Sequence, residues 1–150
     1  MKSAFTMIEL IYVIVILGIL AAVALPKFGS IRNQADISKA RSDVAAIRSS
    51  IMTERQSQLI KGTNTYIPQL SANAATLFTG NGGRKLLTYG IVAGTGTGEW
   101  AVVTNATTNS YTFTVDATPV TFDYNATTGN FSCLRTAAGD TGKYCKSIID

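Results

Sequence analysis

The pattern of hydrophobic positions divides the chain into three parts, and the first of these is almost entirely apolar. It runs from Phe5 to Leu25, and Glu9 is its only charged residue. A helix over this stretch would reach about 31 Å, close to the hydrocarbon thickness of a bilayer. Because no polar face is left for solvent, the pattern favours a membrane-spanning helix over the core helix of a small soluble domain.

The second part, from Pro26 to about Lys61, has apolar residues at helical spacing and predicts an amphipathic helix. Pro26 lacks a backbone N–H and should kink a continuous helix, whereas Gly62 should end it. We therefore expect one long kinked helix. The apolar face of its second half should contain Phe28, Ile31, Ala35, Ile37, Ala40, Val44, Ile47, Ile51 and Leu59, and its solvated face Arg32, Asp36, Lys39, Arg41, Asp43, Arg48, Glu54 and Arg55.

The third part, residues 62–150, is rich in threonine and glycine and contains short runs of strand character. A loop is expected over Thr63–Arg84. Tyr111–Val115 and Val120–Tyr124 alternate apolar and polar residues, which predicts an antiparallel sheet covered on one face. The nearest apolar surface that could cover it is the amphipathic helix, so the expected fold class is α+β. The expected strands are Leu86–Ala93, Trp100–Thr104, Tyr111–Val115, Val120–Tyr124 and Phe131–Leu134.

Composition argues against catalysis. The chain has no histidine, and only 15% of its residues are charged. Imidazole-based catalysis and metal binding are therefore excluded. We find no P-loop, no Gly-x-Ser-x-Gly and no Cys-x-x-Cys, and expect no enzyme activity, no cofactor and no metal site. The basic excess lies between Lys27 and Lys61, where seven basic residues face three acidic ones. This is more typical of a solvated helix face than of a nucleic-acid contact.

The first 28 residues allow three interpretations. Lys2 followed by an apolar stretch and Ala22-Val23-Ala24 could be a secretory signal peptide, which would leave a mature chain beginning near Leu25. A plain transmembrane anchor is the second interpretation. It gives Glu9 no role, although a carboxylate within a membrane segment usually marks function.

The third interpretation rests on the run Ala4-Phe5-Thr6-Met7-Ile8-Glu9-Leu10, followed by a charge-free stretch and then Pro26. This run resembles the class III signal of type IV pilins and pseudopilins, over Ala4 to about Ile31. The resemblance implies that prepilin peptidase removes residues 1–4 by cutting between Ala4 and Phe5, and that the new Phe5 amine is methylated. Ala4 departs from the glycine usual before the cut.

The same resemblance implies roles for three helix residues. Glu9 would pair with the Phe5 amine of a neighbouring subunit, which lowers the cost of burying both charges; alternatively, its carboxylate reaches the lipid headgroups. Gly18 and Pro26 bracket a segment whose helix is weakened at both ends. In related pili this segment melts within the filament, and we expect the same here.

The two cysteines, Cys133 and Cys145, are expected to form a disulfide in an exported domain, with two free thiols as the alternative. Type IV pilins resemble this arrangement, whereas secretion pseudopilins more often carry a calcium-binding acidic loop. Asp140 and Asp150 offer too few oxygens for such a loop. The cysteine pair therefore favours a pilus subunit.

One modification site is indicated by sequence. Asn125 lies in Asp123-Tyr124-Asn125-Ala126-Thr127, which resembles the extended acceptor sequon of bacterial N-glycosylation, whereas Asn105 and Asn130 meet only the shorter form. Turns rich in asparagine and threonine also produce such matches by chance.

Taken together, these features indicate that the chain is a structural subunit of a type IV pilus-like filament. Its expected partners are further copies of itself, prepilin peptidase, the inner-membrane assembly machinery and the membrane before assembly; nucleic acid is not expected. It would lie in the bacterial inner membrane and then in an extracellular filament. A type II secretion pseudopilin and a secreted β-rich binding protein are the alternatives.

Overall fold

The computed structural model describes residues 5–103 and 109–150, with the backbone alone at residue 26. The chain divides into two compact units, residues 1–35 and residues 36–150. One helix, α1 (Met7–Ile60), runs through both units and continues past residue 26 without a break. The predicted long helix is therefore confirmed, while its kink at Pro26 stays a prediction.

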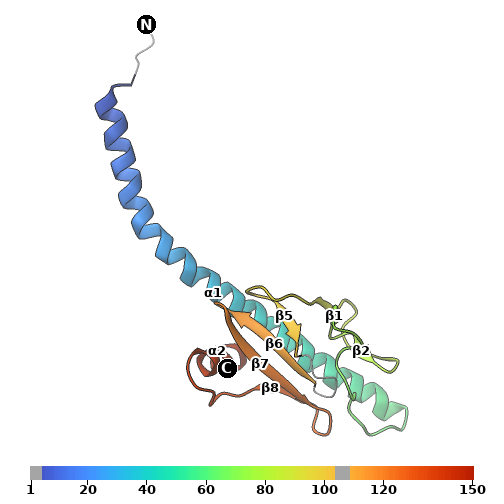
Figure 1. The fold of residues 1–150 in the computed structure, drawn as a ribbon. Helices are drawn as coiled ribbons and strands as arrows, with labels where there is room; N and C mark the ends of the chain where they lie inside the picture. Colours follow the sequence, from blue (N-terminus) through green and yellow to red (C-terminus); the bar gives the residue numbers. More distant parts are fainter. Residues whose placement is uncertain (1–4, 104–108) are drawn as a thin grey trace. The chain divides into compact units, whose positions relative to one another are not determined.

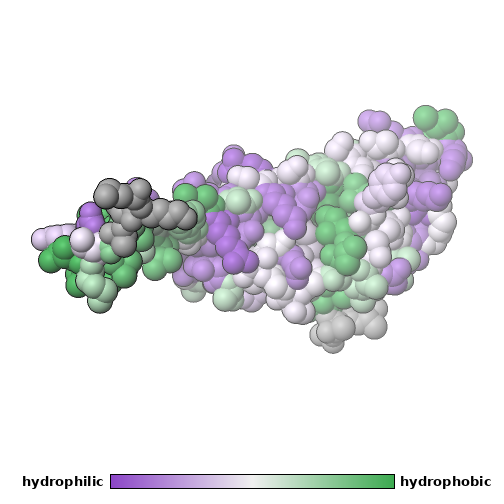
Figure 2. Space-filling view, turned by 90° about the horizontal axis from the view of Figure 1, so that it is seen from above, coloured by the Kyte–Doolittle hydropathy of each residue, from purple (hydrophilic) through white to green (hydrophobic). Residues whose placement is uncertain are grey.

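The first unit consists of the N-terminal part of α1, and its apolar side chains lie open to the surroundings. Between Phe5 and Leu25 the large apolar side chains are 46–84% exposed. Figure 2 shows hydrophobic (green) side chains gathered on this helix. By length and composition α1 is the one helix among the described residues that could cross a membrane.

The end of α1 is set by Gly62, as predicted. Gly62 has a φ of 82°, a left-handed conformation that costs glycine little. The Thr63 N–H donates to the Gln58 carbonyl at 2.9 Å, and the Gly62 N–H donates to the Leu59 carbonyl at 3.0 Å. These two bonds form a Schellman motif, which satisfies carbonyls left unpaired by the last turn.

The main sheet of the second unit has four antiparallel strands in the order β5-β6-β7-β8, lying along the later part of α1 in Figure 1. Every second residue is buried in β6 and, from Val120 onward, in β7, which confirms the predicted alternation. The strands are β5 (Trp100–Val102), β6 (Ser110–Val115), β7 (Thr118–Asn125) and β8 (Asn130–Cys133).

Two short antiparallel ribbons precede the main sheet, and they correct two predictions. The first pairs β1 (Thr76–Leu77) with β4 (Ile91–Val92), and the second pairs β2 (Gly80–Asn81) with β3 (Arg84–Lys85). The predicted loop over residues 63–84 therefore contains strands. Of the predicted strand over residues 86–93, only Ile91–Val92 (β4) is a strand, and the rest of that prediction was wrong.

A bend explains the loss of that longer strand. The chain bends at Thr88 and Tyr89, and Gly90 then lies so close to Leu77 that an added Cβ would be 2.7 Å from the Leu77 carbonyl oxygen. Leu87 instead donates its N–H to the Phe78 carbonyl. Residue 104, the last of another predicted strand, lies outside the described residues.

A second helix, α2 (Asp140–Ile149), was not predicted at all. It is short and contains Gly142, so its helical signal in the sequence is weak. Its buried residues include Tyr144, Cys145 and Ile148, which join the common core. Tertiary packing rather than local propensity therefore stabilises α2.

The core lies between α1 and the sheet, as the amphipathic pattern predicted. The helix contributes Ala40, Val44, Ile47 and Ile51, and all four are buried. Opposite them is an aromatic cluster in which neighbouring ring centroids lie 4.6–6.2 Å apart: Phe78, Trp100, Tyr111, Phe113, Phe122 and Phe131. Such rings bury large apolar areas, which makes this cluster the main source of stability in the unit.

The buried stripe on α1 is shorter than predicted. Phe28, Ile31 and Ala35 are exposed and lie in the first unit, and Leu59 is also exposed. The sheet spans only the middle of the predicted stripe, so helical periodicity alone overestimated the length of the buried face.

Candidate assembly surface

The first turn of α1 is closed by a capping box that joins Thr6 and Glu9. The Thr6 N–H donates to Glu9 Oε2 at 2.8 Å, and the Thr6 hydroxyl donates to the same oxygen at 2.7 Å. In return, the Glu9 N–H donates to Thr6 Oγ1 at 3.3 Å. This role was not predicted from the sequence, although Thr-x-x-Glu before an apolar run is the known signal of a capping box.

This geometry gives Glu9 a partner within its own chain and leaves acceptor capacity for a second one. The capping bonds use Oε2, whereas Oε1 takes no part in them. An ionised carboxylate has about four lone-pair sites and can accept further donors. Glu9 is also exposed, so a cationic group from another molecule could reach it.

Phe5 and Gly18, two further predicted sites near the start of the chain, have no packing partners among the described residues that require these residue types. Phe5 is 84% exposed just before the capped turn. Gly18 lies within unbroken helix, and a Cβ added there would meet nothing within 4 Å. Packing within the chain therefore does not require glycine at this position, whose cost to helix stability is about 1 kcal/mol relative to alanine. Ala4 lies outside the described residues.

The cysteines form the predicted disulfide. Cys133 at the end of β8 is bonded to Cys145 in α2, with the two Cα atoms 5.9 Å apart. The bond ties α2 to the edge of the sheet, and Cys145 is completely buried. Closing a loop of this size stabilises the domain by about 3 kcal/mol.

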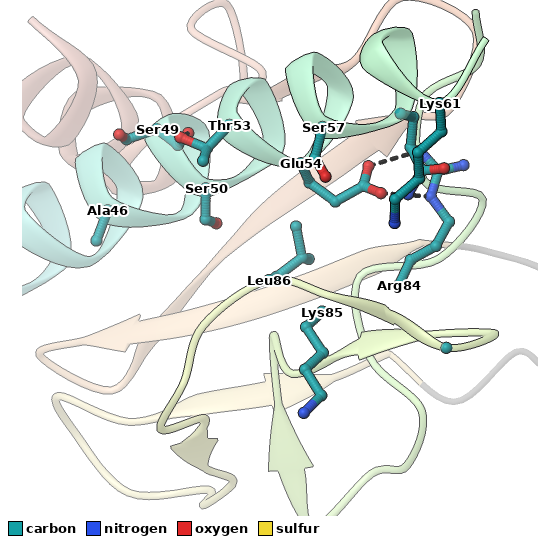
Figure 3. Close-up of a pocket in the computed structure, with 12 residues that line it drawn as sticks. Ala46, Ser49, Ser50, Thr53, Glu54, Ser57, Lys61, Arg84, Lys85 and Leu86 are labelled. Carbon is teal, nitrogen blue, oxygen red and sulfur yellow. Dashed lines mark hydrogen bonds and ion pairs between the residues drawn. The ribbon is translucent and has the colours of Figure 1, made fainter. Parts of the chain in front are cut away.

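Glu54 corrects the predicted charged face of α1, because it is only 6% exposed. Its carboxylate accepts a bidentate pair from Arg84 on β3, with Nε to Oε1 at 2.6 Å and Nη2 to Oε2 at 2.5 Å (Figure 3). The helical period places residue 54 in line with Ile47 and Ile51. The salt bridge to Arg84 offsets the cost of burying the Glu54 charge. No periodic pattern in the sequence indicates this salt bridge.

The Arg84 guanidinium also binds the loop that follows α1. It donates to the Tyr66 carbonyl and to the Thr65 carbonyl, both at 2.9 Å. A groove of about 660 Å³ lies beside the ion pair, between α1 and β3, and several of its lining residues carry hydroxyl groups. Since Ser50 and Thr53 bond back to carbonyls of their own helix, the groove presents no activated nucleophile from these two residues.

Several basic side chains of α1 are used within the domain rather than left free. Lys39 donates to the Gly98 carbonyl, Arg41 to the Ser147 carbonyl and Arg48 to the Phe131 carbonyl. Burial lowers the pKa of Arg48 below its ordinary value, and the nearby charge of Arg135 adds to this effect. These contacts give the basic side chains of α1 a structural role, and they engage N–H donors that a nucleic-acid contact would need.

The fold and these features define a class of protein. An apolar helix with no core of its own continues into a helix packed on an antiparallel sheet, in an α+β domain closed by a disulfide. This arrangement is pilin-like.

Comparisons with known proteins agree with that class. The chain is similar to a type II secretion system core protein G of Pseudomonas aeruginosa, 44% identical over 50 residues, which are 33% of this chain and 35% of the relative. It is similar to a fimbrial protein of Moraxella nonliquefaciens, 44% identical over 55 residues, 37% of this chain and 36% of the relative. A type IV narrow pilus major component of Thermus thermophilus is 48% identical over 47 residues, 31% of this chain and 40% of the relative.

The matched segments thus cover 35–40% of the length of these relatives. No protein-family model and no solved structure matches the chain.

Proposed function

We propose that this chain is a structural subunit of a type IV pilus-like filament. The observation that carries the proposal is the apolar surface of α1 over residues 5–25, which has no core to cover it in its own unit. Lipid would cover this surface before assembly, and the same helices of neighbouring subunits would cover it in a filament. The disulfide-closed domain would then form the outer surface.

The proposed maturation follows from the N-terminal run. Prepilin peptidase would cut between Ala4 and Phe5, and the Phe5 amine would be methylated. The subunit would stay in the inner membrane until the assembly machinery moves it into the filament. The similarity to pilus components and to a secretion core protein supports assembly into a filament, whereas cleavage and methylation rest on the N-terminal run alone.

Glu9 would act in two ways along this route. In the single subunit it caps the first turn of its own helix. In the filament Glu9 Oε1 would accept a hydrogen bond from the Phe5 amine of a neighbouring subunit, so that neither charge is buried alone. Gly18 and Pro26 would let the intervening helix loosen as the subunits pack.

The test is the sequence of the mature N-terminus together with electron microscopy of the cell surface. We expect the membrane-held protein to begin at methylated Phe5, and filaments to disappear when the chain is deleted. A mature protein that begins at Leu25 would contradict the filament proposal and favour a secreted binding protein.

A secretion pseudopilin is the second candidate, because one similar protein is named as a core component of type II secretion. Deletion distinguishes the two candidates. A pilus subunit predicts loss of surface filaments with normal protein secretion, whereas a pseudopilin predicts impaired secretion in cells that never had long filaments. We assign the chain no catalysis and no cofactor in either case.

A further inference from the structure

The turn between β7 and β8 has a fixed shape. Asn125 pairs with Asn130 at the ends of the two strands, and residues 126–129 form the loop between them. Gly129 has a φ of 72° and lies against the Tyr66 ring, where an added Cβ would be 2.1 Å from a ring carbon. This close approach ties the loop to the segment that follows α1.

The Asn125 side chain is held in one orientation by this loop. Its Oδ1 accepts the N–H of Thr127 at 2.8 Å and the N–H of Thr128 at 3.2 Å. The amide group is planar, so Nδ2 lies on the side away from these two donors. Asn125 is exposed, and no hydrogen bond from its Nδ2 is found to any residue within 5–103 and 109–150.

The acidic residue of the sequon lies on the same face as the acceptor. Residues two apart on a strand point to the same side of the sheet, so Asp123 and Asn125 of β7 share a face. Thr127 lies in the loop that follows, and all three residues are exposed. Tyr124 points the other way, into the core, with 7% of its surface exposed. The fold thus presents Asp123, Asn125 and Thr127 to solvent, while Tyr124 is buried and Ala126 is half-buried against the core.

Asn130 provides a comparison within the same hairpin. Its sequon is Asn130-Phe131-Ser132, but Phe131 is completely buried. The Asn130 Nδ2 also donates to the Ser132 hydroxyl at 3.1 Å, so acceptor and hydroxyl are bonded to each other. Phe131 lies between the acceptor and the hydroxyl, so the core holds the tripeptide itself, whereas Ala126, the residue at that place in the Asn125 sequon, is only half-buried. Asn105, the third candidate, lies outside the described residues.

We infer that Asn125 is the N-glycosylation acceptor of this chain. The co-reactant is an oligosaccharide carried on a lipid pyrophosphate, together with a transferase that recognises an acidic residue two positions before the asparagine. Nδ2 attacks the first sugar carbon and forms a C–N bond, the carbon–oxygen bond to the pyrophosphate breaks, and one proton leaves Nδ2. The inference needs export of the domain, as the proposed function does, but it does not need filament assembly.

The test uses the full chain purified from the membranes of cells that hold such a transferase and its lipid-linked donor. We expect an intact mass higher by one oligosaccharide, and a glycopeptide that contains residue 125. Asn125→Gln should remove the added mass completely, and Asn130→Gln should leave it unchanged. Filament number is not measured in this experiment, so the result is independent of the filament proposal.

Two milder variants keep the test valid if Asn125→Gln disturbs the turn. Thr127→Val removes the hydroxyl but keeps the backbone N–H, and Asp123→Asn removes only the acidic charge. Both should lose the modification, whereas Thr127→Ser should retain it. An intact Cys133–Cys145 bond in each variant shows that the exported domain has folded. Unmodified Asn125 in folded protein, in cells that glycosylate another acceptor, would overturn the inference, and so would modification at Asn130.

Discussion

Ile14 and Ile47 lie on the same helix and have the same side chain, yet Ile14 is 57% exposed and Ile47 is completely buried. The difference comes from what each part of α1 contacts. The later part packs on an aromatic sheet within its own domain, whereas the first part has only the surroundings to cover it. After residue 36 the apolar surface of α1 stabilises the fold, and before it the apolar surface is free to drive the association that we propose.

The largest expected effect concerns association and uses Glu9. Glu9→Gln keeps a side-chain acceptor for the capping box but removes the charge, and Glu9→Leu removes both. In either variant the Phe5 amine would be buried unpaired in the proposed filament, at a cost of about 3–5 kcal/mol for each subunit. We expect few or no filaments by electron microscopy, with processed subunit accumulating in the membrane.

Thr6→Val is the matched control, because it removes the capping hydroxyl and leaves the carboxylate in place. It should still form filaments. Normal filaments in Glu9→Gln cells would show that the amine needs no charged partner. If Thr6→Val is as defective as Glu9→Leu, the capping box rather than intersubunit pairing explains the role of Glu9.

The next effect concerns the buried ion pair of the domain. Glu54→Ala leaves the half-buried Arg84 guanidinium without its carboxylate partner and should lower the free energy of unfolding by about 3 kcal/mol. Trp100 is the only tryptophan and is completely buried, so its fluorescence reports unfolding of the full chain in detergent. The exposed pair Arg135–Asp150 is the control, and Arg135→Ala should cost about 1 kcal/mol or less. Equal costs for the two variants would mean that burial does not strengthen the role of Glu54.

The two isoleucines test the comparison directly. Ile47→Ala removes buried methyl groups and should destabilise the domain by about 2–5 kcal/mol in the same unfolding experiment. Ile14→Ala should leave domain unfolding unchanged, since Ile14 is exposed and is not one of the core residues. A shift in domain stability on Ile14→Ala would show that the first part of α1 supports the fold.

The smallest effect is a pH dependence. Burial raises the pKa of Tyr124 to about 12, and the Arg84 charge opposes this only in part. Because this folded-state pKa lies above the ordinary value of about 10, the contribution of Tyr124 is complete below pH 10 and is lost as the pH rises toward 12. Tyr124→Phe should flatten this part of the stability profile, although it also loses the hydrogen bond to the Ile67 carbonyl, worth about 1 kcal/mol. Tyr89→Phe, at an exposed position, is the control and should leave the stability profile unchanged. If the profile of Tyr124→Phe matches that of the native chain, Tyr124 is not the cause of the pH dependence.

Local patterns in the sequence determined the elements that depend on local physics. The apolar run of residues 5–25, the amphipathic period around Val44 and Ile47, the stop at Gly62 and the alternation in β6 and β7 were each readable from neighbouring residues. Periodicity and turn chemistry act over a few residues, so they survive without knowledge of the fold. The capping box at Thr6 and Glu9 was equally local and could have been found from its spacing.

Tertiary structure alone decided the features that join distant parts of the chain. Arg84 meets Glu54 from thirty residues away, α2 is stabilised through Cys145 and its buried face, and Gly90 is drawn against Leu77, which breaks a predicted strand. The difference between the sequons at Asn125 and Asn130 is also of this kind, because it depends on which residues the core buries. No periodic pattern in the sequence indicates such contacts. They form because a buried charge needs a partner and a weak helix needs a surface to pack on. Only the folded chain provides both.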